Sequence, residues 1–177
     1  MEYLNKKAYA ENIKAAEYYL SLAESSREGQ RWNIISVIIY SAFAIEAYLN
    51  HAGISLRDNE WDSWDAENHP SPEQKLESLD VQLETEEAAS FTELFQLRNM
   101  VAHGRSNVVF KSVRKPQNNI VGAMNNLSSE FEARTTLKKT KKLHKGARKI
   151  ISQINESTLK SGSVELWNIG NGSLRTS

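Results

Sequence analysis

The chain has 177 residues, of which 40% are hydrophobic and 25% are charged, and its formal net charge is zero. These values are typical of a soluble globular protein that is long enough to bury one core, and they exclude fibrous and disordered classes. The absence of cysteine excludes a disulfide framework and a thiolate metal site, and it is compatible with the reducing cytoplasm, where we expect the protein to act.

The first two segments predict a pair of helices. Residues 3–26 form an amphipathic pattern in which apolar residues alternate spacings of four and three, namely Tyr9, Ile13, Ala16, Leu20 and Ala23. After Gly29, residues 31–50 are apolar on all sides, which is typical of either a membrane span or a buried helix. Because Ser36, Ser41 and Glu46 interrupt a run that is too short to cross a bilayer, we predict a buried central helix. Residues 1–7 lack an apolar stretch, so we expect no secretory signal.

Glu46 is the only Asp, Glu, Lys or Arg between Arg31 and Arg57. A carboxylate on an otherwise apolar helix needs a partner, because an unpaired buried charge is very costly. Arg98 is the first candidate for that partner. The pair could orient a site, or it could be a plain structural ion pair without chemistry.

The middle of the chain predicts an acidic loop and a short helix. Residues 54–71 are predicted to form the loop, with Trp61 and Trp64 as anchors that pack it down. From Ser71 a short helix is expected to begin, because Ser is a good N-cap and Pro72 is tolerated in the first turn. This helix is predicted to run through Leu76 and Leu79.

The stretch from Leu94 to Arg105 places an arginine and a histidine, Arg98 and His103, five residues apart at the end of a predicted helix. A helix over residues 84–103 is predicted, ending at Gly104. Five residues of a regular helix place the Arg98 and His103 side chains about 140° apart. Either the last turn unwinds, or the two side chains serve a site that something else completes, such as a second copy of the chain.

The rest of the chain predicts an irregular insertion and one long helix. A short strand is expected at residues 108–113 and a loop at 116–126, followed by a helix that starts at Ser128 or Ser129. Its apolar stripe consists of Ala133, Leu137, Thr140, His144, Ala147, Ile151 and Ile154. His144 is therefore interpreted as a packed histidine. We expect one helical domain over residues 1–156 and a flexible or docked tail over 157–177.

Charge is distributed unevenly along the chain. Residues 58–93 carry twelve acidic side chains against Lys75 alone, whereas residues 98–149 carry thirteen basic ones against two glutamates. The basic half could track an RNA backbone, or the two halves could attract each other within the fold. The RNA-binding candidates are Arg105, Lys138, Lys139, Lys142 and Lys145.

Two short stretches resemble HEPN domains, which are all-α modules. Arg98-Asn-Met-Val-Ala-His103 is similar to the Rx4-6H motif of that family, in which a polar residue commonly follows the arginine, as Asn99 does here. Ser41-Ala-Phe-Ala-Ile-Glu-Ala-Tyr-Leu-Asn50 looks like the second helix of many bacterial members, where an acidic residue accompanies the motif arginine. The resemblance covers roughly residues 5–155. It implies an all-α, up-and-down bundle of four to five helices, with an irregular or β-like insertion before the last long helix.

For active members, the resemblance implies metal-independent cleavage of RNA, often in toxin–antitoxin or defence settings. The candidate catalytic residues are Arg98, Asn99, His103 and Glu46. No HExxH, CxxC or phosphate-loop motif is present, so neither a metal site nor a cofactor is expected. RNA and a second copy of the chain are the expected partners, with an antitoxin or defence protein as a further one. A non-catalytic RNA- or nucleotide-binding module and a structural, partner-binding bundle remain alternatives.

Overall fold

The computed structural model describes residues 7–102 and 134–160, and these residues form six α-helices and no strand. The all-α prediction is therefore confirmed for this part of the chain, while the expected strand at 108–113 and the loop at 116–126 lie outside it. Of the tail expected over residues 157–177, residues 157–160 belong instead to the last helix, and the rest lies outside the described residues. In chain order the helices are α1 (Ala8–Ser25), α2 (Gln30–Arg57), α3 (Asn59–Asn68), α4 (Pro72–Ser78), α5 (Thr85–Ala102) and α8 (Leu137–Lys160).

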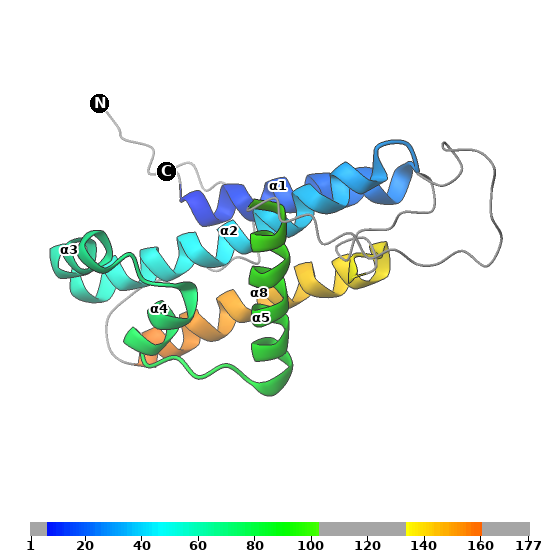
Figure 1. Ribbon diagram of the computed structural model, residues 1–177. Helices are drawn as coiled ribbons and strands as arrows, with labels where there is room; N and C mark the ends of the chain where they lie inside the picture. The colour runs from blue at the N-terminus through cyan, green and yellow to red at the C-terminus, as the bar shows by residue number, and fades with distance from the viewer. Residues whose placement is uncertain (1–6, 103–133, 161–177) are drawn as a thin grey trace, which may run out of the picture.

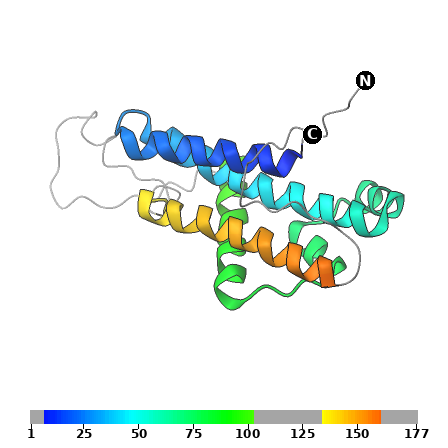
Figure 2. The ribbon, with the colours of Figure 1, turned by 180° about the vertical axis from the view of Figure 1, so that it is seen from behind.

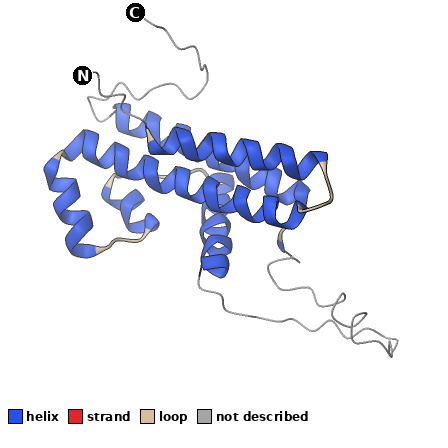
Figure 3. Ribbon diagram, turned by 90° about the horizontal axis from the view of Figure 1, so that it is seen from above, coloured by secondary structure: helices blue, strands red, loops and turns tan. Residues whose placement is uncertain are grey.

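Helix α2 is the centre of the fold, as its apolar sequence predicted. It contacts α1, α3, α4, α5 and α8. Figures 1 and 2 show α1, α2 and α8 lying side by side along the long direction of the molecule, while α5 runs across them. The view from above in Figure 3 also shows α5 pointing away from this layer. The arrangement thus differs from a strict up-and-down bundle, because α5 crosses the layer instead of joining it.

The burial of α2 follows from its composition. Ile38, Ile45, Tyr48 and Leu49 are almost completely buried. The most apolar 18-residue window of α2 is long and apolar enough to span a membrane, with a mean hydropathy of 1.5, and half of it is buried inside the fold. Helix α2 therefore lies at the centre of the fold and is partly buried there, in agreement with the prediction of a central helix.

The predicted loop over residues 54–71 is wrong. Helix α2 continues to Arg57, and α3 follows after a single break at Asp58, whose φ is 47°. Trp61 is buried and stacks against Gly53, where an added Cβ would lie 2.0 Å from the indole ring. The tryptophans are thus anchors, as expected, but they hold a helix, and their spacing of three is a helical spacing.

Hydroxyl side chains set the starts of α4 and α8. Ser71 and Gln74 form a capping box at the start of α4, with Pro72 in its first turn, as predicted. A continuous helix from Ser128 is not observed, because Thr135 and Thr136 are not helical. The Thr136 hydroxyl accepts the backbone N–H of Lys139 at 3.3 Å, so α8 begins after it. The predicted stripe of α8 is otherwise confirmed, since Thr140, His144, Ala147, Ile151 and Ile154 are all buried.

Candidate functional site

Arg98 occupies the next position of the buried stripe of α5, after Phe91, Leu94 and Phe95. The stripe points toward α2, so the guanidinium reaches the edge of the core where α5 crosses the central helix. There Arg98 Nη2 donates to Glu46 Oε2 at 3.1 Å. The predicted contact between Glu46 and Arg98 is confirmed.

The guanidinium of Arg98 is held from three sides. Besides the bond to Glu46, its Nη1 donates to Asn99 Oδ1 at 3.0 Å, and its carbon lies 5.3 Å from the centre of the Phe95 ring. Its Nε is buried and has no hydrogen-bond partner among the described residues. These contacts fix the orientation of a side chain that otherwise has many rotamers.

The ion pair lies at the surface and is only partly buried. The Arg98 side chain is 21% exposed and that of Glu46 is 33% exposed. A guanidinium has five N–H groups, and the described contacts use only part of them. Arg98 can therefore donate to an oxygen of a bound anion while it keeps its contact with Glu46.

Three of the four candidate catalytic residues come together, because Arg98, Asn99 and Glu46 form one hydrogen-bonded group. The fourth, His103, is the residue directly after α5 and lies outside the described residues, as does the RNA-binding candidate Arg105.

Part of the positive charge on the basic face of α8 is compensated by glutamates within the fold, which the sequence does not show. Of the four candidate lysines, Lys139 pairs with Glu93 at 2.5 Å and Lys142 pairs with Glu86 at 3.1 Å. Lys138 and Lys145 are exposed, and neither has an ion-pair partner within the described part of the chain. The acidic partners come from residues 58–93, so the two oppositely charged halves of the chain attract each other within the fold.

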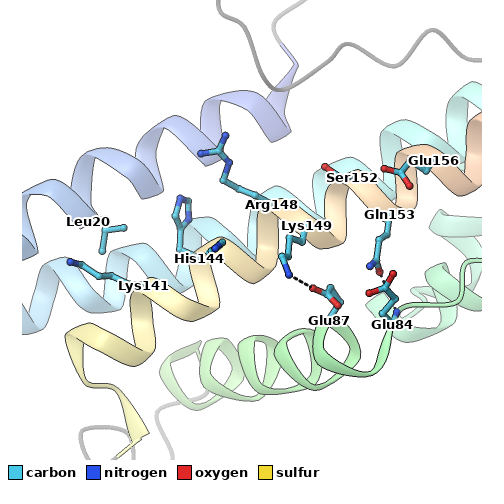
Figure 4. A pocket seen from close by; sticks show the side chains of 11 residues that line it. Leu20, Glu84, Glu87, Lys141, His144, Arg148, Lys149, Ser152, Gln153 and Glu156 are labelled. Carbon is cyan, nitrogen blue, oxygen red and sulfur yellow. Dashed lines mark hydrogen bonds and ion pairs between the residues drawn. The ribbon is translucent and has the colours of Figure 1, made fainter.

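A groove of about 670 Å³ runs along α8 between α1 and α5 (Figure 4). Its lining mixes charges: Lys141, Lys145, Arg148 and Lys149 face Glu84, Glu87 and Glu156. Glu87 is buried, and Lys149 Nζ donates to its Oε1 at 3.1 Å, which is the dashed contact in Figure 4. The hydrogen bond from Lys149 to Glu87, strengthened by the charge of Glu87, raises the pKa of Lys149. The four cations exceed the three anions by only one charge, so the groove offers little net charge for a ligand of one sign.

His144 packs inside the fold, as predicted. It is 6% exposed, and its Nδ1 lies 3.0 Å from the Oγ of Ser41 on α2, with which it shares a hydrogen bond. Its Nε2 is buried and has no hydrogen-bond partner in the part of the chain that the structure describes. Burial lowers the pKa of His144. The ring therefore joins α8 to α2 as a neutral group.

Sequence reasoning missed a buried lysine that joins three helices. Lys75 on α4 is 4% exposed, and its Nζ lies 2.6 Å from Asp65 Oδ1 on α3 and donates to Asn50 Oδ1 on α2 at 2.7 Å. A signal was present, because Lys75 is the only basic residue among the twelve acidic ones of residues 58–93. Its contacts are structural, and it lies apart from Arg98 in the sequence and the fold.

No three Asp, Glu or His side chains are grouped to hold a metal ion in residues 7–102 and 134–160. Comparison with protein-family models finds no match to this chain. Searches of curated proteins and of solved structures find no match either. The resemblance to HEPN domains therefore stays a prediction that rests on the residues quoted above.

Proposed function

We propose that the protein is a metal-independent endoribonuclease of the HEPN type, acting in the cytoplasm as a homodimer with a shared site. The observation that carries the proposal is the group formed by Arg98, Glu46 and Asn99. It holds a guanidinium in one orientation at the surface, one turn before the motif histidine. An oriented arginine of this kind suits a phosphate oxygen, with which it can form paired, charge-assisted hydrogen bonds.

In the proposed reaction the 2′-oxygen of a ribose attacks the adjacent phosphorus. His103 of one subunit takes the proton of the 2′-hydroxyl, and the partner's His103 gives a proton to the departing 5′-oxygen. The products are a 2′,3′-cyclic phosphate and a 5′-hydroxyl, so no water or cofactor is consumed in this step. Arg98 neutralises the charge that develops on the phosphate, Asn99 orients it, and Glu46 positions Arg98 without touching RNA.

The need for both a base and an acid supports the shared site. Each chain offers one histidine in the motif, whereas a two-fold pair offers two. The pair also removes the difficulty that Arg98 and His103 lie about 140° apart on a regular helix. The two subunits can present these side chains to the same phosphate from different sides.

A non-catalytic RNA- or nucleotide-binding module is the second candidate. It is favoured by the hydrogen bond between Arg98 and Asn99, which holds the guanidinium in one orientation. Such a module needs the oriented guanidinium but no proton transfer. In either case a toxin–antitoxin or defence setting, with a protein partner that restrains the activity, is what the resemblance implies.

One RNA-cleavage assay separates these functions. Wild type, His103→Ala and the control His69→Asn are incubated with RNA, with and without a chelator. Asn is chosen at position 69 because its φ is 46°, a conformation that Asn tolerates. We expect wild type and control to cleave equally with chelator present, and His103→Ala to be slower by about 100-fold or more.

Two further measurements complete the assay, namely the chemical ends of the cleavage products and the binding of RNA. Products that end in a 2′,3′-cyclic phosphate, and resistance of RNA with 2′-O-methyl groups, are expected. Cleavage that the chelator abolishes, or that His103→Ala retains in full, contradicts the proposal. RNA binding by fluorescence anisotropy without any cleavage supports the second candidate instead.

A further inference from the structure

One face of α2 carries large apolar side chains that none of the helices within residues 7–102 and 134–160 covers. Trp32, Phe43 and Ile54 are 66%, 42% and 41% exposed. They are eleven residues apart, which is close to three full turns, so they lie on one line along the helix. Ile39 and Ala47 are partly buried and lie on the same line. We call these five residues the α2 stripe.

The neighbours of α2 border the α2 stripe on two sides. On one side, Tyr40 stacks on Tyr19 of α1, with ring centres 5.6 Å apart. On the other, Glu46 binds Arg98 of α5. A row of exposed aromatic and aliphatic side chains on the central helix is typical of a surface that is buried in an assembly.

We propose that the α2 stripe binds a second copy of this chain, with the two α2 helices antiparallel and a two-fold axis at Phe43. The positions of the stripe residues support this partner, because they are symmetric about Phe43. Trp32 and Ile54 each lie eleven residues from it, and Ile39 and Ala47 each lie four residues from it. In an antiparallel pair, Trp32 of one copy therefore faces the smaller Ile54 of the other. In the same way Ile39 faces the smaller Ala47, so the surface is complementary to itself, as a two-fold interface requires.

Charges at the two ends of α2 fit the same arrangement. Around the start of α2, the exposed cations Arg27 and Arg31 outnumber the exposed acid Glu28. Around its end, the exposed acids Asp58, Glu60 and Asp62 outnumber the exposed cation Arg57. An antiparallel pair that crosses at a shallow angle brings the start of one helix near the end of the other. A parallel pair would instead place like charges together.

The arrangement also affects the candidate site, in a step that rests on the proposed function. Glu46 lies three residues from Phe43, on the α5 side of the α2 stripe. A two-fold axis that runs across the helices keeps both copies of Glu46 on the same side of the pair. Their offset along the helices is roughly 9 Å, from a rise of 1.5 Å per residue. Both Arg98 side chains then border one cleft.

Single cysteines test the interface, because the natural chain has none. Full-length Phe43→Cys is oxidised with diamide at micromolar concentration and run on a non-reducing gel. We expect a cross-linked dimer, since residues at a two-fold axis between packed helices come within the Cα distance of a disulfide. The control Ser63→Cys, an exposed position on α3, is expected to remain monomeric on the gel.

A mixture of two variants tests the direction of pairing. Ile39→Cys and Ala47→Cys are expected to cross-link with each other when mixed, and each much less with itself. Self-linking of Ile39→Cys alone indicates a parallel pair and overturns the proposal. A wild-type chain that sediments as a monomer at these concentrations, or equal cross-linking of Ser63→Cys, overturns it as well.

The outcomes for the interface and for the proposed function remain separate. A dimer that cross-links through Phe43→Cys but does not cleave RNA refutes the ribonuclease and leaves the interface. A chain that sediments as a dimer and cleaves RNA in the presence of chelator, but does not cross-link through Phe43→Cys, refutes this interface and leaves the proposed function. If Phe43→Cys does not cross-link, but RNA protects its thiol from alkylation by a maleimide reagent, the surface binds nucleic acid instead of a second copy and the proposal is overturned.

Discussion

At the scale of residues, the positions of Glu46 and Arg98 explain why their contact could be predicted from the sequence. Glu46 is isolated in a long apolar helix, and Arg98 interrupts the apolar stripe of another. Each of these positions is unfavourable for a charge on its own, so the two charges were predicted to meet. The 3.1 Å contact between them is a consequence of that shared need. Their partial exposure is what leaves the guanidinium accessible to a ligand.

Replacing Glu46 tests its role in positioning Arg98. We expect Glu46→Ala to lower the unfolding free energy by about 1 kcal/mol or less, because the pair is partly solvated. We expect a larger effect on function, a loss of about tenfold in kcat/KM for RNA cleavage, because Arg98 is no longer held in one orientation. Chemical denaturation and cleavage kinetics measure the two effects.

Two matched variants accompany this measurement. Glu46→Gln keeps an oxygen that can accept from Arg98 and should recover part of the activity. Glu67→Ala removes an exposed glutamate from α3 and should change neither quantity. Cleavage by Glu46→Ala at the wild-type rate would mean that the ion pair is structural only.

At the scale of helices, the contacts between α5 and α8 decide how the basic face of α8 is used. Glu86, Glu87 and Glu93 of α5 pair with lysines of α8, and Glu17 of α1 pairs with Arg148. The sequence shows these lysines as one continuous cationic face. In the fold, only Lys138 and Lys145 of the four candidate lysines are without an acidic partner in the described residues.

Two double variants separate the paired from the unpaired lysines. If the face binds RNA phosphates, Lys138→Gln with Lys145→Gln should weaken binding and lower the slope of log K against log salt by up to about 1.4, or 0.7 for each contact. Lys139→Gln with Lys142→Gln should change the slope less, because those charges are already compensated. Fluorescence anisotropy at several salt concentrations gives both slopes. Equal slopes for wild type and both variants would show that the face is only solvated.

At the scale of the whole molecule, one buried and one half-buried histidine connect the helices. His144 joins α8 to α2, and His51 of α2 lies beside Tyr9 of α1, with ring centres 5.4 Å apart. Burial lowers the pKa of both histidines, and the nearby charge of Lys7 lowers that of His51 further. The packed core therefore holds two groups that resist protonation.

Acid should destabilise the fold through these histidines. A histidine whose folded pKa is below its ordinary value of 6.5 takes up a proton more readily in the unfolded chain. Stability is therefore complete above about pH 7 and falls as the pH drops through 6.5 toward the folded pKa, by at most about 1.4 kcal/mol per pH unit for each histidine. Urea unfolding between pH 7.5 and 5.5 measures this slope. His144→Gln should flatten it, and the exposed-site control His69→Asn should leave it unchanged; a slope that His144→Gln does not alter would contradict the assignment.

The sequence by itself determined the helical class, the buried central helix, the start of α4 and the stripe of α8. Each of these follows from spacing or from a cap formed by neighbouring residues, and such signals are local. It also predicted the partner of Glu46, because a buried charge restricts its neighbours strongly.

Only the tertiary structure decided that residues 59–68 are a helix, that α5 crosses the layer, and which lysines of α8 are compensated. In the first case the polar sequence around Trp61 resembles a loop, and the contact of its indole with Gly53 on the preceding helix stabilises the helical form. In the others, the outcome depends on which side chains meet across helices that are far apart in the chain. Helical periodicity specifies the face that a helix buries, but the crossing angle and the ion pairs depend on the shapes and charges of the packed surfaces, which only exist once the chain has folded.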